Sequence, residues 1–357
     1  MGNISIFKKF LPYFQDRYMF QICPIDRVND LMIFIDTYWK KGHILARSSD
    51  FLKWQHYNKT DNKYNFILAI YKQTNEIHAI FGYTLSSHFD DNIKEPIFWG
   101  NIWKNREDIN EPGLGMMVYW LTYDIYCNVG RSGLGLSKNA VRQARGYVKT
   151  GLSDQYYILH PYKKEFKIAL NIHASERYNL NAVVSNKIFV SCPAILFNEI
   201  VDPIVDSIPR HKSKMYYVNR FYNHPIYTYH VYVINNISGG IMGVIFCRIC
   251  EFDNARCLRI VDYFGKDGAL IGCLNAFLNL LIENDAEYID FICVNMPSIE
   301  METSGFINRR KIIDVIIPTY FEPFIRDNID IYYSIDKYHP PFNQRIFKAD
   351  SDQDRPS

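Results

Sequence analysis

The sequence has no uninterrupted apolar run of the ~18 residues that a membrane-spanning helix requires, and its start lacks the ordered regions of a signal peptide. It also has no long run of charges of one sign, since 40 Lys and Arg residues stand against 38 Asp and Glu residues, for a net charge of +2. Nucleic-acid binders carry a basic face, so this balance argues against that class. We therefore expect a cytoplasmic protein with no membrane or nucleic-acid partner.

The eight cysteines form no pattern that indicates a metal site. Most lie inside apolar runs, where a reduced thiol behaves as a small hydrophobic side chain. Cys247 and Cys250 form a single C-x-x-C motif in the strand-like segment 243–250, and no second pair follows at the spacing of a zinc site. We therefore expect free core thiols and no bound metal.

Apolar and aromatic residues, in contrast, are plentiful. Of the 357 residues, 48% are hydrophobic and 16% are aromatic, which is enough for two cores of the usual ~150 residues each. The apolar pattern is weakest over residues 182–198. The sequence therefore predicts an N-terminal domain over residues 1–190 and a C-terminal domain over residues 191–357.

The order of the predicted elements recurs along the chain. Each half is expected to hold a hairpin, a third strand, a glycine-containing loop, a helix and a further strand. In the first half, after a helix over 28–39, these elements cover 66–71, 78–85, 97–103, 116–126 and 156–159, with an additional helix over 137–147 that Gly151 ends. In the second half they cover 227–234, 241–249, 258–264, 269–283 and 288–294, followed by strands over 315–317 and 329–335. The hairpins and the third strands each recur after 161 residues, which indicates two copies of one unit.

The loop from Asn110 to Met116 joins a predicted strand to a predicted helix. The first N–H groups of a helix have no intrahelical partner, and glycine lets a phosphate approach them closely. Pro-Gly is also an ordinary turn signal, so the loop is either a diphosphate site or a plain turn. Its place between a strand and a helix favours the diphosphate site.

This loop resembles the coenzyme A loop of the GNAT acyltransferase superfamily, which reads Q/R-x-x-G-x-G/A. Gly113 and Gly115 match, and Asn110 stands where the family has Gln or Arg. The resemblance implies an α/β (α+β) protein of two tandem GNAT-like domains, each a mixed, mainly antiparallel sheet flanked by helices. It also implies a coenzyme A thioester as co-substrate, bound by Asn110, Gly113, Leu114, Gly115 and Met116.

Residues 147–152 resemble the Tyr-x-x-x-Gly-Phe helix end of the same superfamily. The resemblance implies that Tyr147 protonates the departing thiolate, and a packing role is the alternative. Asn139 resembles the helix-start Asn that touches the pantetheine arm, one residue out of phase with the usual spacing to Tyr147. The second copy has glycines at Gly265 and Gly268 without the G-x-G frame. We therefore expect the first copy to bind coenzyme A and the second to shape the acceptor site.

Over most of its length the chain is also similar to a narrower group, the tandem-GNAT N-acyltransferases that modify nucleotide-linked amino sugars for surface polysaccharides such as O-antigen. FdhC-like acyltransferases, which act on dTDP-linked 3-amino-3,6-dideoxyhexoses, are the best-known type. The similarity lies in Trp54-Gln55-His56, in residues 220–225 with Tyr227 and Tyr229, and in the terminal residues 347–356. It implies transfer of an acetyl or a short hydroxyacyl group, such as 3-hydroxybutanoyl, to the amino group of the sugar.

Amide formation from a thioester needs a neutral amine, a donor to the developing oxyanion and a proton for the leaving thiolate. His224, in a polar and aromatic turn, is one candidate base, with a structural turn histidine as the alternative. Asp262, the one acid in the strand over 258–264, is the second candidate, and a solvent-facing side chain is its alternative. An ordered water would also suffice.

For the acceptor, Trp54 and Tyr222 are the rings expected to stack on a nucleobase, and Arg220 and Arg355 are the guanidinium groups expected to bind its diphosphate. The C-terminal tail, with Asp352, Asp354 and Arg355, has no apolar side chain to bury. Such a tail would fray unless a substrate ordered it. We expect it to fold over the sugar-nucleotide site.

Two other functions fit the same pattern. An aminoacyl-transferring ligase can also use tandem GNAT-like domains, but it would carry a basic RNA-contacting insertion, which this sequence lacks. A non-catalytic binding module in which both loops have decayed is the other alternative, because a fold does not fix a function. The retained Gly113 and Gly115 argue against such decay.

Overall fold

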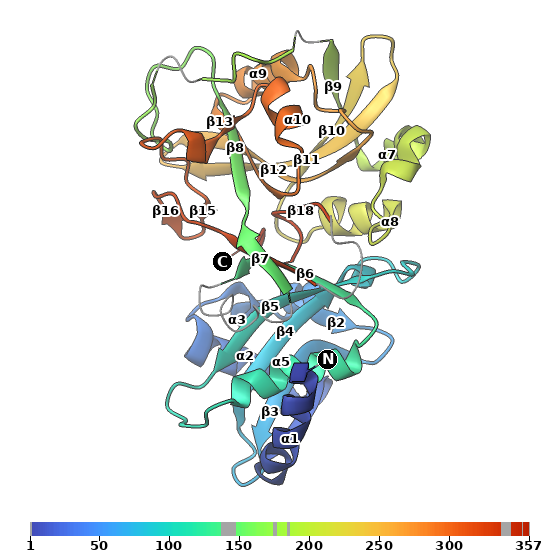
Figure 1. The fold of residues 1–357 in the computed structure, drawn as a ribbon, viewed down its shortest axis with the longest axis vertical. Coiled ribbons are helices and arrows are strands. Elements are labelled where there is room, and N and C mark those ends of the chain that lie inside the picture. The colour runs from blue at the N-terminus through green and yellow to red at the C-terminus, as the bar shows by residue number, and fades with distance from the viewer. Residues whose placement is uncertain are drawn as a thin grey trace.

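The computed structural model describes residues 2–136, 148–173, 177–183, 186–336, 344–351 and 353–356. Within this part of the chain the strands form two eight-stranded sheets and one short hairpin, and the two sheets follow one another along the long axis of the molecule (Figure 1). Helices flank both sheets. This arrangement confirms the predicted α/β class with two mixed sheets.

Sheet one has the strand order β1-β3-β4-β5-β6-β17-β7, with β2 beside β3. Among these strands only β5 and β6 pair in parallel. The strands of its middle are buried on both faces, as their near-continuous apolar sequences require. Their bounds are β1 (Tyr18–Pro24), β2 (Tyr57–Asn58), β3 (Lys63–Tyr71), β4 (Ile77–Leu85), β5 (Ile97–Asn105), β6 (Gly130–Leu136), β7 (Val148–Leu152) and β17 (Tyr332–Asp336).

Sheet two has the order β14-β8-β13-β12-β11-β10-β9, with β18 beside β13. Among these strands only β12 and β13 pair in parallel. Their bounds are β8 (Asp154–Leu159), β9 (Lys187–Ser191), β10 (His230–Asn236), β11 (Ile241–Phe252), β12 (Ala255–Gly265), β13 (Ala286–Val294), β14 (Ile307–Asn308) and β18 (Ile346–Phe347). The separate hairpin is β15 (Tyr320–Phe321) and β16 (Phe324–Ile325).

Helices cover both faces of sheet one. Phe14 and Val118 place α1 and α5 on one face with Phe81 of β4, whereas Leu31 and Leu52 place α2 and α4 on the other with Phe66 of β3. In sheet two, α9 covers one face, and α7 and α8 cover the other. The bounds are α1 (Gly2–Arg17), α2 (Val28–Phe34), α3 (Ile44–Arg47), α4 (Ser49–His56), α5 (Leu114–Ile125), α7 (Ala194–Val201), α8 (Lys214–Tyr217), α9 (Leu274–Glu283) and α10 (Ser298–Thr303), with the 3-10 or π turns η1 (Ile25–Arg27), η2 (Ile35–Trp39), η3 (Ser86–His88), η4 (Asp202–Ser207), η5 (Val218–Tyr222) and η6 (Arg309–Lys311).

The predicted repeat is present in both sheets. A hairpin, a third strand, a helix and a parallel fourth strand occur as β3-β4-β5-α5-β6 and again as β10-β11-β12-α9-β13. Three elements differ from the prediction. The fourth strand of the first copy is β6, whereas the strand predicted for that place over 156–159 is β8 of sheet two. The strand predicted over 315–317 is an isolated bridge between Ile316 and Leu170, and Val148–Leu152 is strand β7, not the end of a helix, and pairs with β17. The helix predicted over 137–147 lies outside the described residues.

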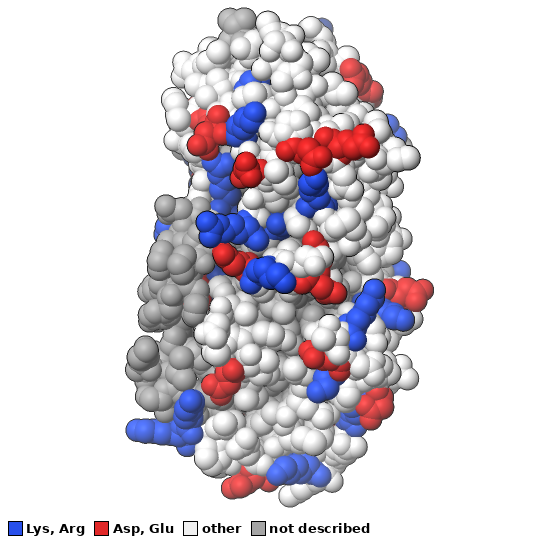
Figure 2. Space-filling model, turned by 90° about the vertical axis from the view of Figure 1, so that its right-hand side faces the viewer, with Lys and Arg blue, Asp and Glu red and all other residues white. Residues whose placement is uncertain are grey.

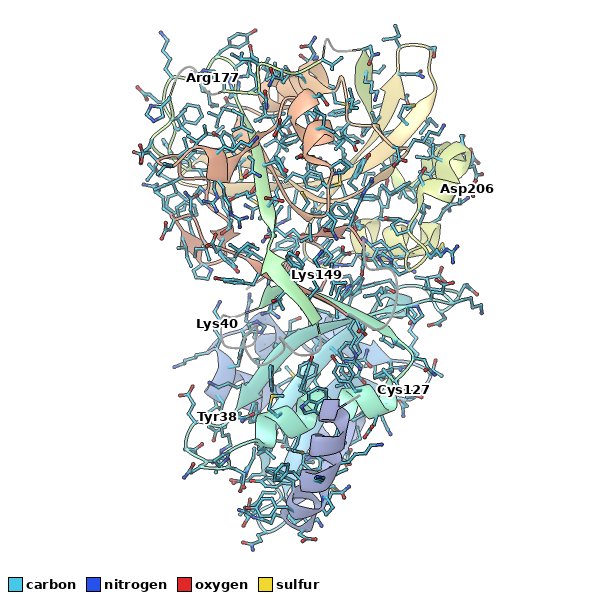
Figure 3. All side chains as sticks on the ribbon, in the orientation of Figure 1. Tyr38, Lys40, Cys127, Lys149, Arg177 and Asp206 are labelled. Atoms are coloured by element: carbon cyan, nitrogen blue, oxygen red, sulfur yellow. The ribbon has the colours of Figure 1, made fainter. Side chains whose placement is uncertain are left out.

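The two sheets exchange strands. β17, from the second half of the sequence, lies between β6 and β7 in sheet one, while β8, from the first half, lies between β14 and β13 in sheet two. Side chains fill the space between the two sheets, where Lys149 of β7 is found (Figure 3). The division of the chain near residue 190 stays a prediction.

The surface carries charges of both signs. Figure 2 shows Lys and Arg side chains interspersed with Asp and Glu over one face of the molecule. No helix in the described part of the chain is both long enough and apolar enough to cross a bilayer.

Candidate functional site

β5 and β6 diverge and form what we call the first fork. They pair in parallel over only three residues each, ending with Trp99 opposite Ser132. Beyond Trp99, β5 continues to Asn105 beside β4 alone, while β6 pairs with β17 on its other side. The fork therefore leaves one edge of each strand without a strand partner in the described part of sheet one.

β5 carries a bulge at this fork. Gly100 pairs with Tyr83 of β4, but the next pair joins Trp103 to Phe81, so that two residues of β5 face a single residue of β4. A bulge takes backbone groups of the longer strand out of the ladder. Polar backbone groups are therefore released where the two strands part.

The helix α5 begins at the loop predicted to bind phosphate. Gly113 precedes it with a φ of 91°, in the left-handed region that favours glycine, and is exposed. The Leu114 N–H donates to the Glu111 carbonyl at 3.2 Å and the Met117 N–H to the Gly113 carbonyl at 3.1 Å, whereas the N–H groups of Gly115 and Met116 have no acceptor inside the helix. Gly115 is buried, and a Cβ on it would lie 2.5 Å from Oδ1 of Asn105. The first glycine thus keeps the helix start open, and the second lets α5 pack closely on β5.

β12 and β13 form a second fork, which the chain itself closes. The two strands pair in parallel as far as Ile260 and Phe291. Beyond this point β13 pairs with β18 instead, and the Ala349 N–H donates to the Val261 carbonyl at 2.9 Å. The C-terminal segment, residues 344–351 and 353–356, therefore occupies the second fork.

The same segment also passes the first fork. The Ser351 hydroxyl donates to the Gly100 carbonyl at 3.1 Å, and the side chain of Gln353 stands where a Cβ on Gly135 would lie. Gly100 precedes Val261 by 161 residues, the period of the repeat. One segment thus contacts equivalent positions of both sheets.

No family model matches the chain, and no curated protein matches it. Solved structures do resemble it. A conserved protein of unknown function from Enterococcus faecalis V583, a probable N-acyltransferase, is similar with a TM-score of 0.53 at 9% identity, over 89% of this chain and 72% of its own. A GCN5-related N-acetyltransferase from Anabaena variabilis ATCC 29413 is similar with a TM-score of 0.52 at 10% identity, over 89% and 72%. The chain has the GNAT fold. At these identities the likeness concerns the fold alone.

The GNAT fold brings four of the predicted site residues together. The ring of Trp54, on α4, has its centroid 4.5 Å from that of His224 and 5.4 Å from the Arg220 guanidinium carbon. Arg220 Nη2 donates to the carbonyl oxygen of Asp354 at 3.4 Å. A helix of the first half, a turn of the second half and the C-terminal segment therefore meet at one place.

Arg248, which the sequence did not single out, holds the C-terminal segment there. Its Nη2 and Nε lie 3.0 Å and 3.1 Å from Oδ1 of Asp354, and the Tyr229 hydroxyl donates to Oδ2 at 2.8 Å. Burial opposes the charged form of Asp354, but Arg248 and Tyr229 outweigh it and lower the pKa of this carboxyl. Protein groups therefore order the segment, which corrects the expectation that only a substrate would do so.

A cavity of about 440 Å³ opens beside Arg248. Its walls include Tyr227, Arg256, Phe321 and Glu322. The Arg248 guanidinium carbon lies 4.0 Å from the centroid of the Tyr227 ring, and the Tyr227 hydroxyl donates to Glu322 at 2.7 Å. The cavity thus offers aromatic faces together with charges of both signs, next to the turn that carries His224.

Asp262 is fully buried, so the solvent-facing alternative is wrong. Lys212 Nζ lies 2.6 Å from Asp262 and 2.8 Å from Asp350, and the Tyr263 N–H donates to the second oxygen of Asp262 at 2.7 Å. Burial raises the pKa of Asp262 to about 6, with the nearby Asp350 carboxylate adding to the rise. The three charged groups join the C-terminal segment to sheet two.

His224 is placed as a hydrogen-bond donor. Its Nδ1 accepts the N–H groups of Ile226 at 3.1 Å and Tyr227 at 2.8 Å. In the neutral ring the proton therefore lies on Nε2, which is buried and without a partner. Burial, with Arg220 nearby, lowers the pKa of His224 to about 3. In this tautomer the ring has no free lone pair with which to act as a base.

The remaining predicted residues are dispersed. Tyr222 donates its hydroxyl to the Cys192 carbonyl at 2.7 Å and packs with Phe197 in the apolar layer of sheet two. This ring therefore packs in the core, and not as the stacking face expected for a nucleobase. Asn110 is exposed in the loop before α5, Met116 is half-buried in its first turn, and Arg355 is half-buried. Asn139, Tyr147 and Asp352 lie outside the described residues.

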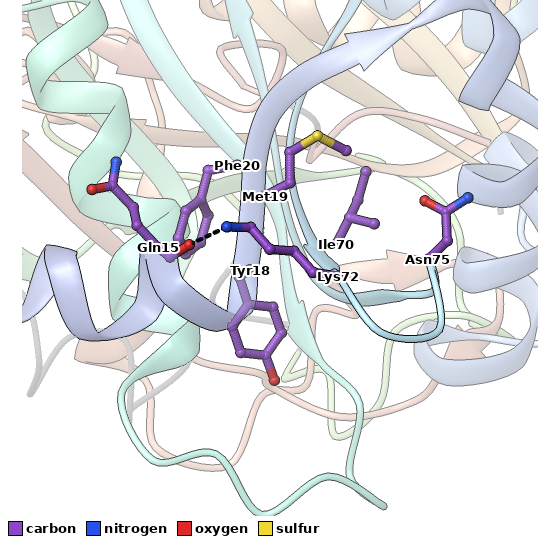
Figure 4. Close-up of a pocket in the computed structure, with 7 residues that line it drawn as sticks. All are labelled: Gln15, Tyr18, Met19, Phe20, Ile70, Lys72 and Asn75. Atoms are coloured by element: carbon purple, nitrogen blue, oxygen red, sulfur yellow. Dashed lines mark hydrogen bonds between the residues drawn. The ribbon is translucent and has the colours of Figure 1, made fainter.

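A second cavity, of about 500 Å³, lies between α1, β1 and the β3–β4 hairpin (Figure 4). Lys72 crosses it and donates to the Gln15 carbonyl at 2.6 Å. No predicted site residue lines it. In the described part of the chain, no three His, Cys, Asp or Glu side chains are grouped as a metal ion would need.

Proposed function

We propose that this chain transfers an acyl group from acyl-CoA to an amine at the first fork. The observation that carries the proposal is the first fork itself, which lies beside the exposed start of α5, whereas β18 occupies the second fork. This difference supports the expected division of labour, with coenzyme A in the first copy and the acceptor shaped by the second.

The residues at the start of α5 fit a diphosphate. Gly113 is exposed, and a Cβ on it would meet only the Phe14 ring at 3.5 Å. Free N–H groups and the positive end of the helix favour an anion. Glu111, the acid of this loop, is paired with Arg17 at 2.5 Å, so its charge is neutralised. The N–H groups of Gly115 and Met116 would hold the phosphates, Gly113 and Leu114 would form the turn that leaves room for them, and Asn110 and, by resemblance, Asn139 would lie at the rim.

In the reaction, the nitrogen lone pair of the amine forms a C–N bond with the thioester carbon, the C–S bond breaks, and the proton lost by the amine goes to the thiolate. Backbone groups released by the β5 bulge beside Gly100 can donate to the carbonyl oxygen, where negative charge develops. The resemblance assigns protonation of the thiolate to Tyr147. His224 would serve as a donor in this scheme.

For the acceptor we propose the amino group of a nucleotide-linked, dTDP-type amino sugar, used in the cytoplasm for surface polysaccharide synthesis. The similarity to FdhC-like acyltransferases is the main support. The cavity beside Arg248 adds support, because Tyr227 and Phe321 offer faces for a base and Arg256 offers a partner for phosphate. The Tyr227 ring stacks on the ring of His224, which in turn contacts the ring of Trp54, and Arg220 lies over Trp54. The cavity is therefore linked to the cluster around Trp54.

Thermal unfolding with increasing coenzyme A tests the first step. A ligand at ~100 times its dissociation constant adds ~2.7 kcal/mol of stability. Mass spectrometry of acyl-CoA mixed with nucleotide-linked amino sugars then tests the transfer. No stabilisation would favour a decayed binding module, and stabilisation by aminoacyl-tRNA instead of coenzyme A would favour the ligase.

A further inference from the structure

His56, at the end of α4, has a buried ring nitrogen with no hydrogen-bond partner. Its Nδ1 lies 3.1 Å from the carbonyl oxygen of Tyr83. A carbonyl only accepts, so Nδ1 carries the proton and Nε2 keeps a free lone pair. His56 is completely buried, and Nε2 has no partner. This is the opposite tautomer to that of His224.

A second unpartnered acceptor lies at the bulge of the first fork. Asn101 donates its Nδ2 to Thr84 Oγ1 at 2.7 Å, which leaves Oδ1 buried and unpartnered. Thr84 follows Tyr83 on β4, so His56 and Asn101 are anchored to consecutive residues of one strand. Gln55, the neighbour of His56, also has a buried and unpartnered carbonyl oxygen, Oε1.

These three atoms accept hydrogen bonds and cannot donate them. A buried acceptor without a donor costs free energy, and native proteins rarely leave one in that state without a reason. A ligand that satisfies them must present N–H or O–H donors to them. A neutral primary amine offers two N–H groups and keeps its lone pair for attack on the acyl carbon.

The surroundings keep the ring of His56 neutral. Burial lowers the pKa of His56 well below 6.5. The nearby His88, Arg355 and His43 lower this pKa further, whereas the hydrogen bond to the Tyr83 carbonyl raises it without outweighing the burial. A neutral ring offers its lone pair to an N–H group and does not repel a charged amine.

We propose that His56 Nε2 and Asn101 Oδ1 receive the two N–H groups of the acyl-accepting amine, with Gln55 Oε1 beside them. Asn101 directly follows Gly100, the residue at which the first fork opens. With both N–H groups held on this side, the lone pair of the amine points at the acyl carbon in the fork. The inference rests on the proposed acyl transfer and names the groups that orient its acceptor.

The variants His56→Phe and His88→Phe form a matched pair. Each loses one hydrogen bond from a ring nitrogen to a backbone carbonyl, since His88 Nε2 bonds the Trp54 carbonyl at 2.7 Å. Only His56→Phe also removes the free lone pair. We expect His56→Phe to lower kcat/KM for the amine about tenfold more than His88→Phe, with the coenzyme A dissociation constant equal in the two variants. Equal losses in kcat/KM would overturn the inference.

A second pair avoids changing a ring. Asn101→Leu and Thr84→Val both remove the bond between these two residues, but only Asn101→Leu removes Oδ1. We expect the larger rise in KM for the amine from Asn101→Leu.

Because the ring of His56 stays neutral, the acid limb of kcat/KM in the wild type should follow the pKa of each amine tested. A limb fixed at one pH for amines of different pKa would contradict the inference, whereas a wild type that binds no coenzyme A would instead refute the proposed function.

Discussion

Asp354 and Arg248 form a buried ion pair that ties the last described residues of the chain to the middle of sheet two. Two contacts, of 3.0 Å and 3.1 Å, join them, and Asp354 is 1% exposed. The pair stands between the 440 Å³ cavity and the cluster around Trp54. The C-terminal segment is thus an integral part of the candidate site.

The first prediction concerns this ion pair. Asp354→Asn leaves the buried Arg248 with the more distant Glu322 carboxylate, at 3.6 Å, as its remaining counter-charge, and breaking a buried pair typically costs about 3 kcal/mol of unfolding free energy. Denaturant unfolding measures the loss. Glu251→Gln is the control, because it removes an exposed pair with Arg256 at 2.7 Å, which contributes about 1 kcal/mol or less. Equal losses would show that Arg248 finds another partner.

The second prediction concerns Gly115. An Ala here would place its Cβ against the amide of Asn105, so Gly115→Ala should lower the unfolding free energy by roughly 1–3 kcal/mol through overpacking. Asn105→Ala makes room for that Cβ. The double variant should therefore be more stable than the sum of the single losses predicts, by about 1 kcal/mol in a double-mutant cycle. If the losses of unfolding free energy in the two single variants simply add, α5 and β5 are not in tight contact at this point.

The third prediction concerns the ion pair between Arg17 and Glu111. Arg17→Gln leaves the buried Glu111 carboxylate unneutralised beside the proposed diphosphate, so we expect the coenzyme A dissociation constant to rise about fivefold at low salt and less at high salt. Calorimetry measures the constant. The double variant Arg17→Gln with Glu111→Gln should recover most of the affinity. A loss that persists in the double variant would indicate that Arg17 contacts the ligand itself.

The fourth prediction concerns acid stability. The pKa of His224 is about 3 when folded and about 6.5 when unfolded. The unfolded chain therefore binds the extra proton first, and stability falls as the pH drops from about 6.5 toward about 3. His224→Gln should remove roughly 1.5 kcal/mol of the loss between about pH 6.5 and about pH 5. An unchanged pH dependence of unfolding in this variant would contradict the burial of a neutral ring.

Periodic apolar sequences predicted their elements well. The helix expected over 28–39 coincides with α2 and η2, and the hairpin strands differ from β3 and β4 by a few residues. The sequence missed β6, Gly130–Leu136, because three of its seven residues are glycine, which lowers strand propensity. It also placed the second-copy helix too early, since Gly272 with a φ of 80° delays the start of α9 to Leu274.

The structure brings together some of the residues that the sequence named. Trp54, Arg220 and Asp354 were expected to bind the acceptor and His224 to act as a base, and these four residues lie at one place. Arg248 and His56 were not chosen. Arg248 lies on an otherwise apolar strand, and the significance of His56 depends on Tyr83, which is 27 residues away in the sequence. Only tertiary contacts determine which ring nitrogen holds the proton, so sequence spacing could not have separated the roles of two histidines.

The position of β17 sets the order in which the molecule can be completed during synthesis. In sheet one β17 separates β6 from β7, and Ser132 pairs with Ile335. A ribosome must therefore release nearly the whole chain before the first sheet closes. Until then the edges of β6 and β7 are exposed, and unpaired strand edges promote association with other chains. A gene cut near residue 190 would yield a first half that lacks a strand from its own sheet.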